Sequence, residues 1–138
     1  LPPSSVKDIR ISHVNVSDAD CRYACLIAGI EGHPVCDVRI SDLTIGYRGG
    51  ITLDDVAQQR GCNPFFYEPA RTDKNRGVRS YPEPSAHGLQ PAWGFSIHHA
   101  EDITLRRIRL TTATPDERPW LHEDNVRNLK IRNLKVRN

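Results

Sequence analysis

An eleven-residue pattern occurs four times in this chain and constrains its fold more than any other feature. The copies begin at residues 6, 35, 100 and 126 and align without gaps. In each copy Asp or Asn is third, and an aliphatic residue fills the fourth, sixth, ninth and eleventh places. These places take 16 of the 30 Ile, Val and Leu residues of the chain. They are Ile9, Ile11, Val14, Val16, Val38, Ile40, Leu43, Ile45, Ile103, Leu105, Ile108, Leu110, Leu129, Ile131, Leu134 and Val136.

The spacing predicts two short strands in each copy. The fourth and sixth places are two residues apart, as are the ninth and eleventh, which is the period of a strand with one buried face. Two polar residues rather than one separate the pairs, for example Ser41 and Asp42, so the chain must bend there. A third strand per coil is expected over residues 23–30, 95–99 and 119–123, ahead of the later copies.

The recurrence distance favours a solenoid. Copies start 29 residues apart in the first half and 26 apart in the second, a range in which repeats bury their apolar faces by stacking. We therefore predict an all-β fold, a right-handed parallel β-helix, with residues 1–138 forming one partial segment of it. A leucine-rich repeat would need a helix or a Leu/Asn signature that these copies lack. A β-sandwich with similar strands is the alternative.

The pattern begins five residues after the start of the chain and stops two residues before its end. Solenoids normally finish in atypical capping units, and none is visible here. We therefore expect this chain to be a piece of a longer protein.

The pattern is lost over residues 46–92, which are rich in Gly, Pro and aromatic residues. Turn formers at this density predict one long irregular loop excursion, with a short helix near residues 53–60. Long loops in compact folds are usually functional or disordered, and the aromatics argue against disorder. We expect ligand contacts in this excursion.

Bulk properties exclude several classes of protein. The net charge of +2 requires no acidic partner, and no apolar run approaches the ~18 residues of a membrane span. The basic residues near the C-terminus flank aliphatic places, as on a solvated strand, and lack interleaved aromatics, so we expect no nucleic acid. Cys21, Cys25, Cys36 and Cys62 show no zinc-site spacing, so no metal is expected. Cys21 and Cys25 could form a disulfide, or all four could be reduced.

Three stretches carry a resemblance to a known family. They are GHPVCDVRISDLTIGYRGG (32–50), SYPEPSAHGLQPAWGFSIHHAEDITLRRIRL (80–110) and DERPWLHEDNVRNLKIRNLKV (116–136). Their order resembles the C-terminal coils of family 28 glycoside hydrolases, the polygalacturonases and rhamnogalacturonases, over residues from about 23 to 138. The landmarks are Gly49-Gly50, Tyr81-Pro82-Glu83, Gly88 and Pro91-Ala92-Trp93-Gly94-Phe95. His98-His99 departs from the expected Arg-His.

The resemblance implies inverting hydrolysis by clustered aspartates, carried in the family by Asn-Thr-Asp, Asp-Asp and Gly-His-Gly motifs followed by Arg-Ile-Lys. Those motifs are missing here. Asp54-Asp55 falls in the excursion, where a solvated loop or a helix N-terminus explains it, and His87-Gly88 lacks the leading glycine. The resemblance therefore implies that the catalytic coils lie upstream, that no cofactor is needed, and that this segment alone is inactive.

Five residues are candidate substrate contacts. Trp93 and Tyr81 could stack on a sugar ring, and Arg48 could pair with a galacturonate carboxylate through two hydrogen bonds. His87 and His99 could hydrogen-bond to hydroxyls. Two of these residues have alternative structural roles, because Trp93 could cap the core and Arg48 could cover the adjacent coil with its stem.

We therefore expect the C-terminal β-helix part of a secreted or periplasmic pectin-degrading hydrolase. Its partners would be a pectin-like polysaccharide and the upstream coils of the same protein. A non-catalytic polysaccharide-binding or structural β-helix module is the alternative. A pectate-lyase-like calcium enzyme would need an acidic column, but the fifth places hold Arg10, Arg39, Thr104 and Lys130.

Overall fold

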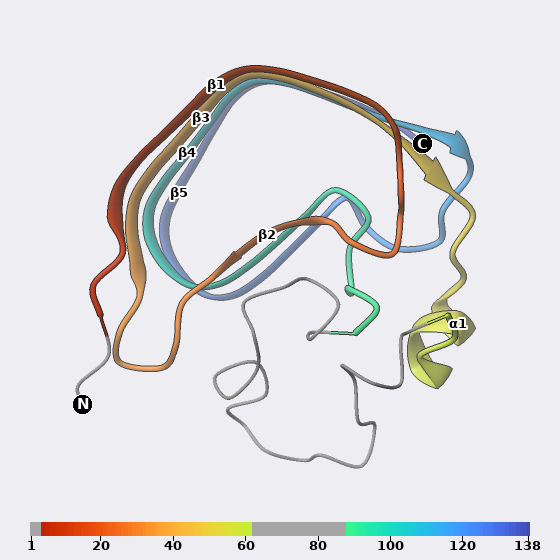
Figure 1. The fold of residues 1–138 in the computed structure, drawn as a ribbon, viewed down its shortest axis with the longest axis horizontal. Coiled ribbons are helices and arrows are strands. Elements are labelled where there is room, and N and C mark those ends of the chain that lie inside the picture. The colour runs from red at the N-terminus through yellow and green to blue at the C-terminus, as the bar shows by residue number, and fades with distance from the viewer. Residues whose placement is uncertain (1–3, 62–87) are drawn as a thin grey trace.

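The computed structural model describes residues 4–61 and 88–138, which form an all-β structure with one short helix. A single parallel sheet curls around an apolar interior like half of a barrel (Figure 1). The elements are β1 (Lys7–Ala19), β2 (Cys25–Ala28), β3 (Val35–Gly49), α1 (Leu53–Gln58), β4 (Phe95–Thr114) and β5 (Leu121–Arg137).

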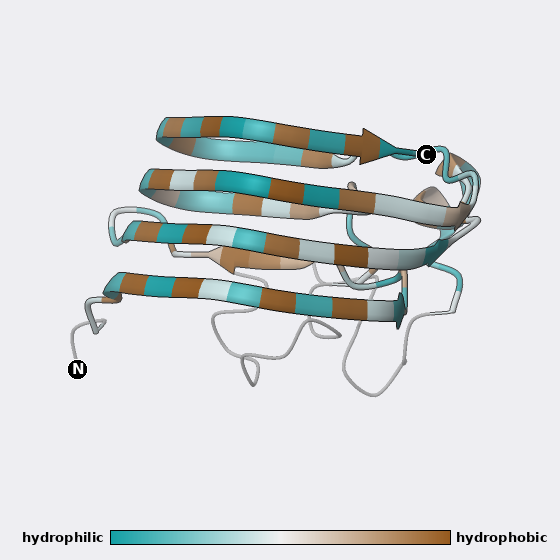
Figure 2. Cartoon of the chain, turned by 90° about the horizontal axis from the view of Figure 1, so that it is seen from above, coloured by the Kyte–Doolittle hydropathy of each residue, from teal (hydrophilic) through white to brown (hydrophobic). Residues whose placement is uncertain are grey.

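The four copies of the pattern stack as β1, β3, β4 and β5, and every neighbouring pair is parallel. The fourth places show the register, since Ile9 lies opposite Val38, Val38 opposite Ile103, and Ile103 opposite Leu129. Hydrophobic and polar positions therefore alternate in step along the stacked strands (Figure 2). The common frame predicted from the sequence is confirmed.

The predicted third strands also form, and they close the other side of the interior. β2 pairs with the first residues of β4, with Cys25 opposite Phe95. The first residues of β5 pair with the same part of β4, with Leu121 opposite Phe95. In β4 and β5 the third strand and the following copy join into one continuous strand, which explains their length.

Each copy bends at residues in the left-handed backbone region. The third places, Asp8, Asp37, Asp102 and Asn128, have φ between 54° and 59°. The eighth places, His13, Asp42, Arg107 and Asn133, have φ between 52° and 57°. Asp and Asn adopt this conformation most readily among residues with a side chain. The recurrence of Asp or Asn in third place is thus explained by a corner. The predicted bend between the two aliphatic pairs is found at the eighth place, but each copy forms one continuous strand rather than the two short strands predicted.

The core is a set of aliphatic ladders, and its burial depends on position in the stack. At the sixth place, Leu105 in β4 is 0% exposed and Ile40 in β3 is 7% exposed. Ile11 at the same place in β1 is 42% exposed, because none of the described strands covers the outer side of β1. The ladder is sealed only where a strand has a neighbour on both sides.

A buried ion pair holds the joints between strands. The side chains of Asp116 and Arg118 are fully buried, with Arg118 Nε 2.8 Å from Asp116 Oδ1. The same guanidinium donates to the carbonyl oxygens of Cys21 at 2.7 Å and Gln90 at 3.2 Å, while Asp116 Oδ2 accepts from the Ile51 amide. One pair therefore ties together the turn after β1, the exit of β3 and the approach to β4.

The short helix α1 forms within the predicted range. The Thr52 hydroxyl caps its N-terminus by accepting from the Asp55 amide, and the Asp55 carboxylate accepts from the Thr52 amide. Arg60 pairs with Asp54 at 2.6 Å and with Asp55 at 3.1 Å. The Asp54-Asp55 pair is therefore the first turn of a capped helix, as the structural explanation predicted.

Candidate functional site

Trp93 is a core residue rather than an exposed sugar platform. Its side chain is 1% exposed and packs edge-on against Tyr47, with ring centroids 5.7 Å apart and planes at 77°. The Tyr47 hydroxyl donates to the Gly94 carbonyl oxygen at 3.0 Å, which fixes the pair. A ring enclosed in this way presents no face to a sugar, so the predicted stacking is corrected in favour of the capping alternative.

Arg48 already holds a carboxylate in the geometry expected for a uronate. Its Nε lies 3.0 Å from Asp18 Oδ1 and its Nη2 lies 3.2 Å from Asp18 Oδ2. The hydrogen bond and charge of Arg48 lower the pKa of Asp18 below 3.8. Because the pair is exposed and links β3 to β1, a ligand would have to displace Asp18. Sugar binding by Arg48 therefore stays a prediction.

His99 takes part in a corner. It lies in the left-handed region with φ of 47°, and the Asn125 side-chain amide donates to His99 Nδ1 at 2.8 Å. In β4, His99 lies just before the first place of the repeated pattern, whereas in β3 Arg48 lies beyond its last place, so the two residues are at opposite ends of the pattern. Tyr81 and His87 lie outside the described residues. Among the candidates that the structure describes, Arg48, Trp93 and His99 are not brought together in one site.

A serine, a histidine and an aspartate that sequence reasoning did not connect lie in line on β4 and β5. Ser96 Oγ is 2.7 Å from His98 Nε2, and His98 Nδ1 is 3.8 Å from Asp124 Oδ2. A nucleophilic serine needs this order of partners but also access to substrate. Ser96 is completely buried, so these three residues do not form an open nucleophilic site. Ser96 and Asp124 instead orient the His98 ring.

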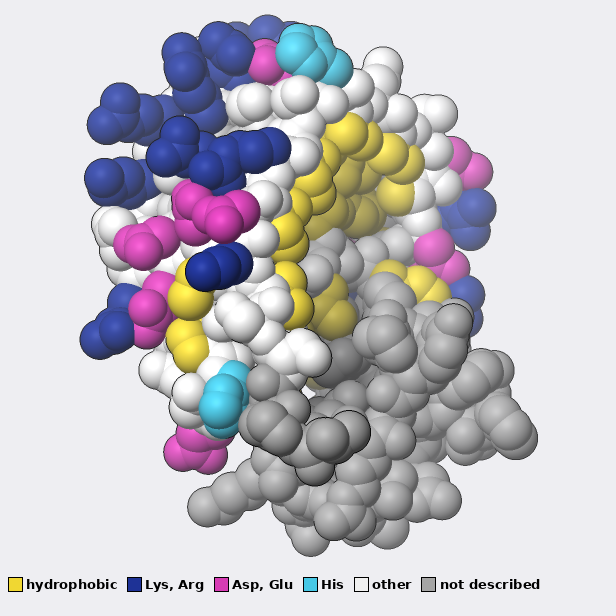
Figure 3. Space-filling model, turned by 60° about the vertical axis from the view of Figure 1, so that its left-hand side comes forward, with side chains coloured by type: hydrophobic (Ala, Val, Ile, Leu, Met, Phe, Trp, Pro, Cys, Tyr) yellow, Lys and Arg dark blue, Asp and Glu magenta, His cyan; other side chains and the backbone are white. Residues whose placement is uncertain are grey.

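The described surface does contain a depression on the outer face of the stacked strands. It has a volume of about 430 Å³ and crosses all four of them, β1, β3, β4 and β5. Its polar lining comes from the fifth and seventh places of each copy and contains five cations and no carboxylate. The polar residues are Arg10, Ser12, Arg39, Ser41, Thr104, Arg106, Lys130 and Arg132. We call this depression the basic groove, and Figure 3 shows Lys and Arg side chains gathered in rows on the molecule.

The cations at the two ends of the basic groove differ in their partners. Arg10 Nη2 lies 3.0 Å from Asp37 Oδ2, and this hydrogen bond is the main cause of the lowered pKa of Asp37. Within the described ranges, Arg106, Lys130 and Arg132 make no ion pair. The β4 and β5 side of the groove is therefore the part with positive charge available to a ligand.

A smaller depression of about 220 Å³ continues the same outer face, lined by Asp42, Thr44, Arg107, Arg109 and Asn133. Arg107 donates to both oxygens of Asp42 and lowers its pKa, so this pair is neutral overall. Over the fifth, seventh, eighth and tenth places, cations fill six of eight positions in β4 and β5 and two of eight in β1 and β3. The positive charge is thus concentrated at one end of the stack.

This groove was missed in the sequence because the outward cations were interpreted strand by strand as solvation. Aligning the four copies provides the missing signal, since parallel strands in register place like-numbered positions about 4.8 Å apart. Among the described residues, His, Cys, Asp and Glu do not gather in threes as a metal site would require. The thiols of Cys21, Cys25 and Cys36 are free.

The chain was compared with models of protein families, with curated proteins and with solved structures, and none of the three comparisons finds a match. In the two described ranges, the structure has no helix with the length and apolar character needed to cross a membrane.

Proposed function

We propose that this chain is the C-terminal part of a right-handed parallel β-helix belonging to a secreted or periplasmic pectin-degrading glycoside hydrolase. Its role is to extend the scaffold and to bind the acidic polysaccharide, while the catalytic aspartates are supplied upstream. The stacking of four copies in one register, with corners at fixed places, supports the β-helix.

The landmarks of the family resemblance support a shared scaffold. Gly49 has φ of 72°, and a Cβ there would lie 1.9 Å from the Thr114 carbonyl oxygen. A Cβ on Gly94 would lie 2.6 Å from the Trp120 carbonyl oxygen. These glycines permit close backbone contacts at the joints, so the resembling residues are ones that this kind of coil requires.

The basic groove is the observation that carries the polysaccharide part of the proposal. Pectin is a polyanion of galacturonate units, and guanidinium groups bind carboxylates through paired hydrogen bonds. Hydroxyls of Ser12, Ser41 and Thr104 lie between the cations and suit sugar hydroxyls. The lining contains no aromatic ring on which a nucleic-acid base could stack, which favours a sugar chain over single-stranded nucleic acid.

Hydrolysis is assigned to residues outside this chain. Inversion needs two carboxyl groups ~6.5–9.5 Å apart with a water between them. Of the two outer depressions described above, which lie among the described residues, the basic groove is lined by no carboxylate and the smaller one by Asp42 alone. The same groove would also serve a non-catalytic polysaccharide-binding module, which is the second candidate function.

Calorimetric titration with polygalacturonate tests the binding. We expect affinity that weakens with added NaCl, and no binding to fully methyl-esterified pectin or dextran, which lack the charge. The double variant Arg106→Gln and Arg132→Gln should lose at least about tenfold in affinity, since each charge-assisted contact contributes about 1.5–3 kcal/mol. Arg60→Gln, just after α1, is the control and should bind as the wild type does.

Equal binding to the neutral polymers, or tighter binding to single-stranded DNA, would contradict the ligand assignment. A reducing-end assay separates the two candidate functions. The chain alone should release no reducing ends, whereas the longer protein should release them with inverted anomeric configuration, as seen by NMR. A longer protein that binds polygalacturonate without cleaving it would favour the non-catalytic module.

A further inference from the structure

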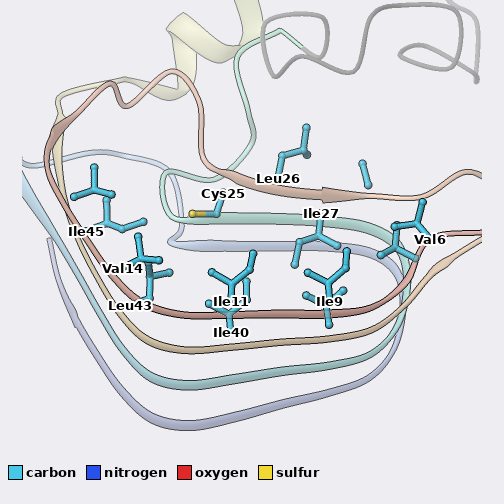
Figure 4. A pocket seen from close by; sticks show the side chains of 14 residues that line it. Val6, Ile9, Ile11, Val14, Cys25, Leu26, Ile27, Ile40, Leu43 and Ile45 are labelled. Atoms are coloured by element: carbon cyan, nitrogen blue, oxygen red, sulfur yellow. The ribbon is translucent and has the colours of Figure 1, made fainter.

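Side chains of each repeated copy alternate between the interior and the outer face of the sheet. The fourth and sixth places point inward, where Ile9, Ile11 and Ile40 help to line an apolar depression of about 460 Å³ (Figure 4). The fifth and seventh places are the neighbours of these residues and therefore point outward, into the basic groove. The selectivity of the groove for a charged ligand depends on these outward places.

Each strand supplies one pair of outward side chains to the basic groove. β1, β3 and β4 each supply one cation and one hydroxyl, whereas β5 supplies two cations. Neighbouring strands are about 4.8 Å apart, which is close to the length of one sugar unit in an extended chain. A polysaccharide that crosses the four strands would therefore present about one uronate to each of them. From β1 to β5, the pairs are Arg10 with Ser12, Arg39 with Ser41, Thr104 with Arg106, and Lys130 with Arg132.

The carboxylate of Asp37 engages both cations of the β1 and β3 half of the groove. Arg10 Nη2 donates to Asp37 Oδ2 at 3.0 Å, and Arg10 Nη1 donates to the carbonyl oxygens of Asp37 and Ile9, each at 3.0 Å. Arg39 Nε lies 3.7 Å from Asp37 Oδ1. The hydrogen bond from Arg10 is the main cause of the lowered pKa of Asp37, so this carboxylate is ionised at neutral pH.

The β4 and β5 half has no equivalent of Asp37. Asp102 holds the third place of β4, and its Oδ1 accepts from the Asn128 side-chain amide at 2.6 Å rather than from a cation. β5 carries the uncharged Asn128 in third place. Among the residues that the structure describes, no carboxylate forms an ion pair with the three cations of this half, Arg106, Lys130 and Arg132.

The two halves should therefore respond differently to a ligand carboxylate. At β1, such a carboxylate would have to displace Asp37 from Arg10, which exchanges one exposed ion pair for another and gains little. At β4 and β5, a ligand carboxylate displaces only water and gains new charge-assisted hydrogen bonds. An uncharged sugar unit, in contrast, can bond to the hydroxyls of Ser12 and Ser41 while the Asp37 pair stays intact.

We propose that Asp37 sets the selectivity of the basic groove by occupying Arg10 and Arg39. The β4 and β5 half requires free galacturonate carboxylates, whereas the β1 and β3 half accepts units whose carboxyl group is methyl-esterified. A methyl ester carries no charge but keeps a carbonyl oxygen, and the ring hydroxyls are unchanged. This inference rests on the proposed function and extends it, because it specifies which units of the polysaccharide must be ionised.

Calorimetric titration with defined tetragalacturonates tests the wild type. The ligands are the free acid, two half-esters with neighbouring esterified units at one end or the other, and a half-ester with alternate units esterified. One of the neighbouring half-esters should bind about as tightly as the free acid, because its free carboxylates reach both β4 and β5. The alternate half-ester has the same charge but should bind about two- to fivefold more weakly, since an ester then faces the cations of β4 or β5.

The variant Asp37→Asn tests the role of the carboxylate itself. Asn suits the left-handed corner, as Asn128 does at the same place in β5. The variant should bind the free acid about two- to fivefold more tightly than the wild type, because Arg10 and Arg39 become available. Its affinity for the better neighbouring half-ester should stay the same. Damage to the structure would not produce such a selective gain.

Two further sets of variants serve as controls. Adding Arg10→Gln and Arg39→Gln to Asp37→Asn should remove the gain, whereas the same two substitutions in the wild type should change affinity little. Asp54→Asn on α1 raises the net charge by the same amount away from the groove, and it should leave the ratio of the two affinities unchanged. Circular dichroism shows whether each variant is folded.

An Asp37→Asn variant that keeps the wild-type ratio between the free acid and the better half-ester overturns the inference. A wild type that binds all the half-esters equally overturns it as well, because the two halves would then not differ. In either case, binding of polygalacturonate would leave the proposed function intact. If no galacturonate binds, both the proposed function and this inference are wrong.

Discussion

Strands β4 and β1 follow the same frame, but their aliphatic residues lie in different surroundings. Leu105 and Ile11 both hold the sixth place, and they are 0% and 42% exposed. β4 has a strand on each side, whereas β1 has one neighbour among the strands that the structure describes. The difference teaches that in this molecule a residue is buried by the strands above and below it. The position of a residue in its own strand decides only whether its side chain points inward. This dependence of burial on the adjacent strands is the nearest-neighbour behaviour of repeat proteins.

The outer faces of the same two strands differ in another way. β4 carries Arg106, Arg107 and Arg109 where β1 carries Ser12, His13 and Asn15. Stacking fixes the inner places to aliphatic residues throughout the chain, and it leaves the outer places free to vary. Charge on the outer face is therefore a better indicator of function here than the core.

The largest expected effect concerns the joints that hold the middle of the stack. Arg118→Ala would leave the buried Asp116 carboxylate without its cation and three segments without their link. We expect a loss of about 3–5 kcal/mol in the free energy of unfolding, measured by urea denaturation. Arg127→Ala, which removes the exposed pair with Glu101, should cost less than about 1 kcal/mol.

Removing both partners of the buried pair sharpens this test. The double variant Asp116→Leu and Arg118→Met should be more stable than Arg118→Ala alone, because it leaves no buried charge unpaired. If Arg118→Ala and Arg127→Ala cost the same, the joints do not stabilise the middle strands as the burial of Asp116 and Arg118 indicates.

The second prediction compares one place in the two strands directly. Leu105→Ala in β4 removes a fully buried side chain and should cost about 2–5 kcal/mol. Ile11→Ala in β1 removes a side chain that is already partly in water and should cost about 1 kcal/mol. Both are read from urea midpoints at low protein concentration. Equal losses would mean that the interior is sealed at β1 as well as at β4.

The smallest expected effect on stability concerns the exposed ion pairs. Here a pair in the middle of the stack and a pair at its end should contribute equally to the loss of stability in acid. The pKa of Asp42 is lowered below 3.8 by hydrogen bonds from Arg107, and that of Asp37 mainly by Arg10. A carboxylate with a lowered folded-state pKa contributes stability above its unfolded value, and this contribution is lost as pH falls through the folded value. The wild type should therefore lose stability below about pH 4.

Asp42→Asn and Asp37→Asn should each flatten this acid dependence slightly and to the same extent. Asn keeps the left-handed corner, as Asn133 and Asn128 do at the same places, so the charge is the main change. Urea midpoints between about pH 2 and 7 give the comparison. A steeper acid loss in either variant would show that the sign of the charge contribution is wrong.

Much of the fold followed from the sequence because two signals agreed. The period of two predicted that the aliphatic side chains point inward. The gapless alignment of the copies predicted which residues of neighbouring strands lie opposite each other, so the pairing of Ile9 with Val38 needed no further information. The corner role of the third place was not recognised, although Asp8 and Asn128 share a tolerance for positive φ. That tolerance was a usable signal.

The remaining features depend on contacts that a linear pattern does not contain. Arg118 donates to the carbonyl oxygen of Cys21, which is 97 positions away in the sequence, so no local motif predicts this contact. Trp93 had two possible roles because an aromatic at a strand entrance suits both a core and a sugar, and only the position of Tyr47 decides between them. The basic groove required all four copies to be aligned at once.

The excursion between β3 and β4 shows how such a chain can acquire new parts. Partner residues are 26 positions apart between β4 and β5 but 65 apart between β3 and β4, and the register is the same in both cases. Closing the longer loop costs only about 1 kcal/mol more, because loop entropy grows with the logarithm of length. Evolution can therefore lengthen, shorten or replace the segment at this joint while the neighbouring ladder stays intact.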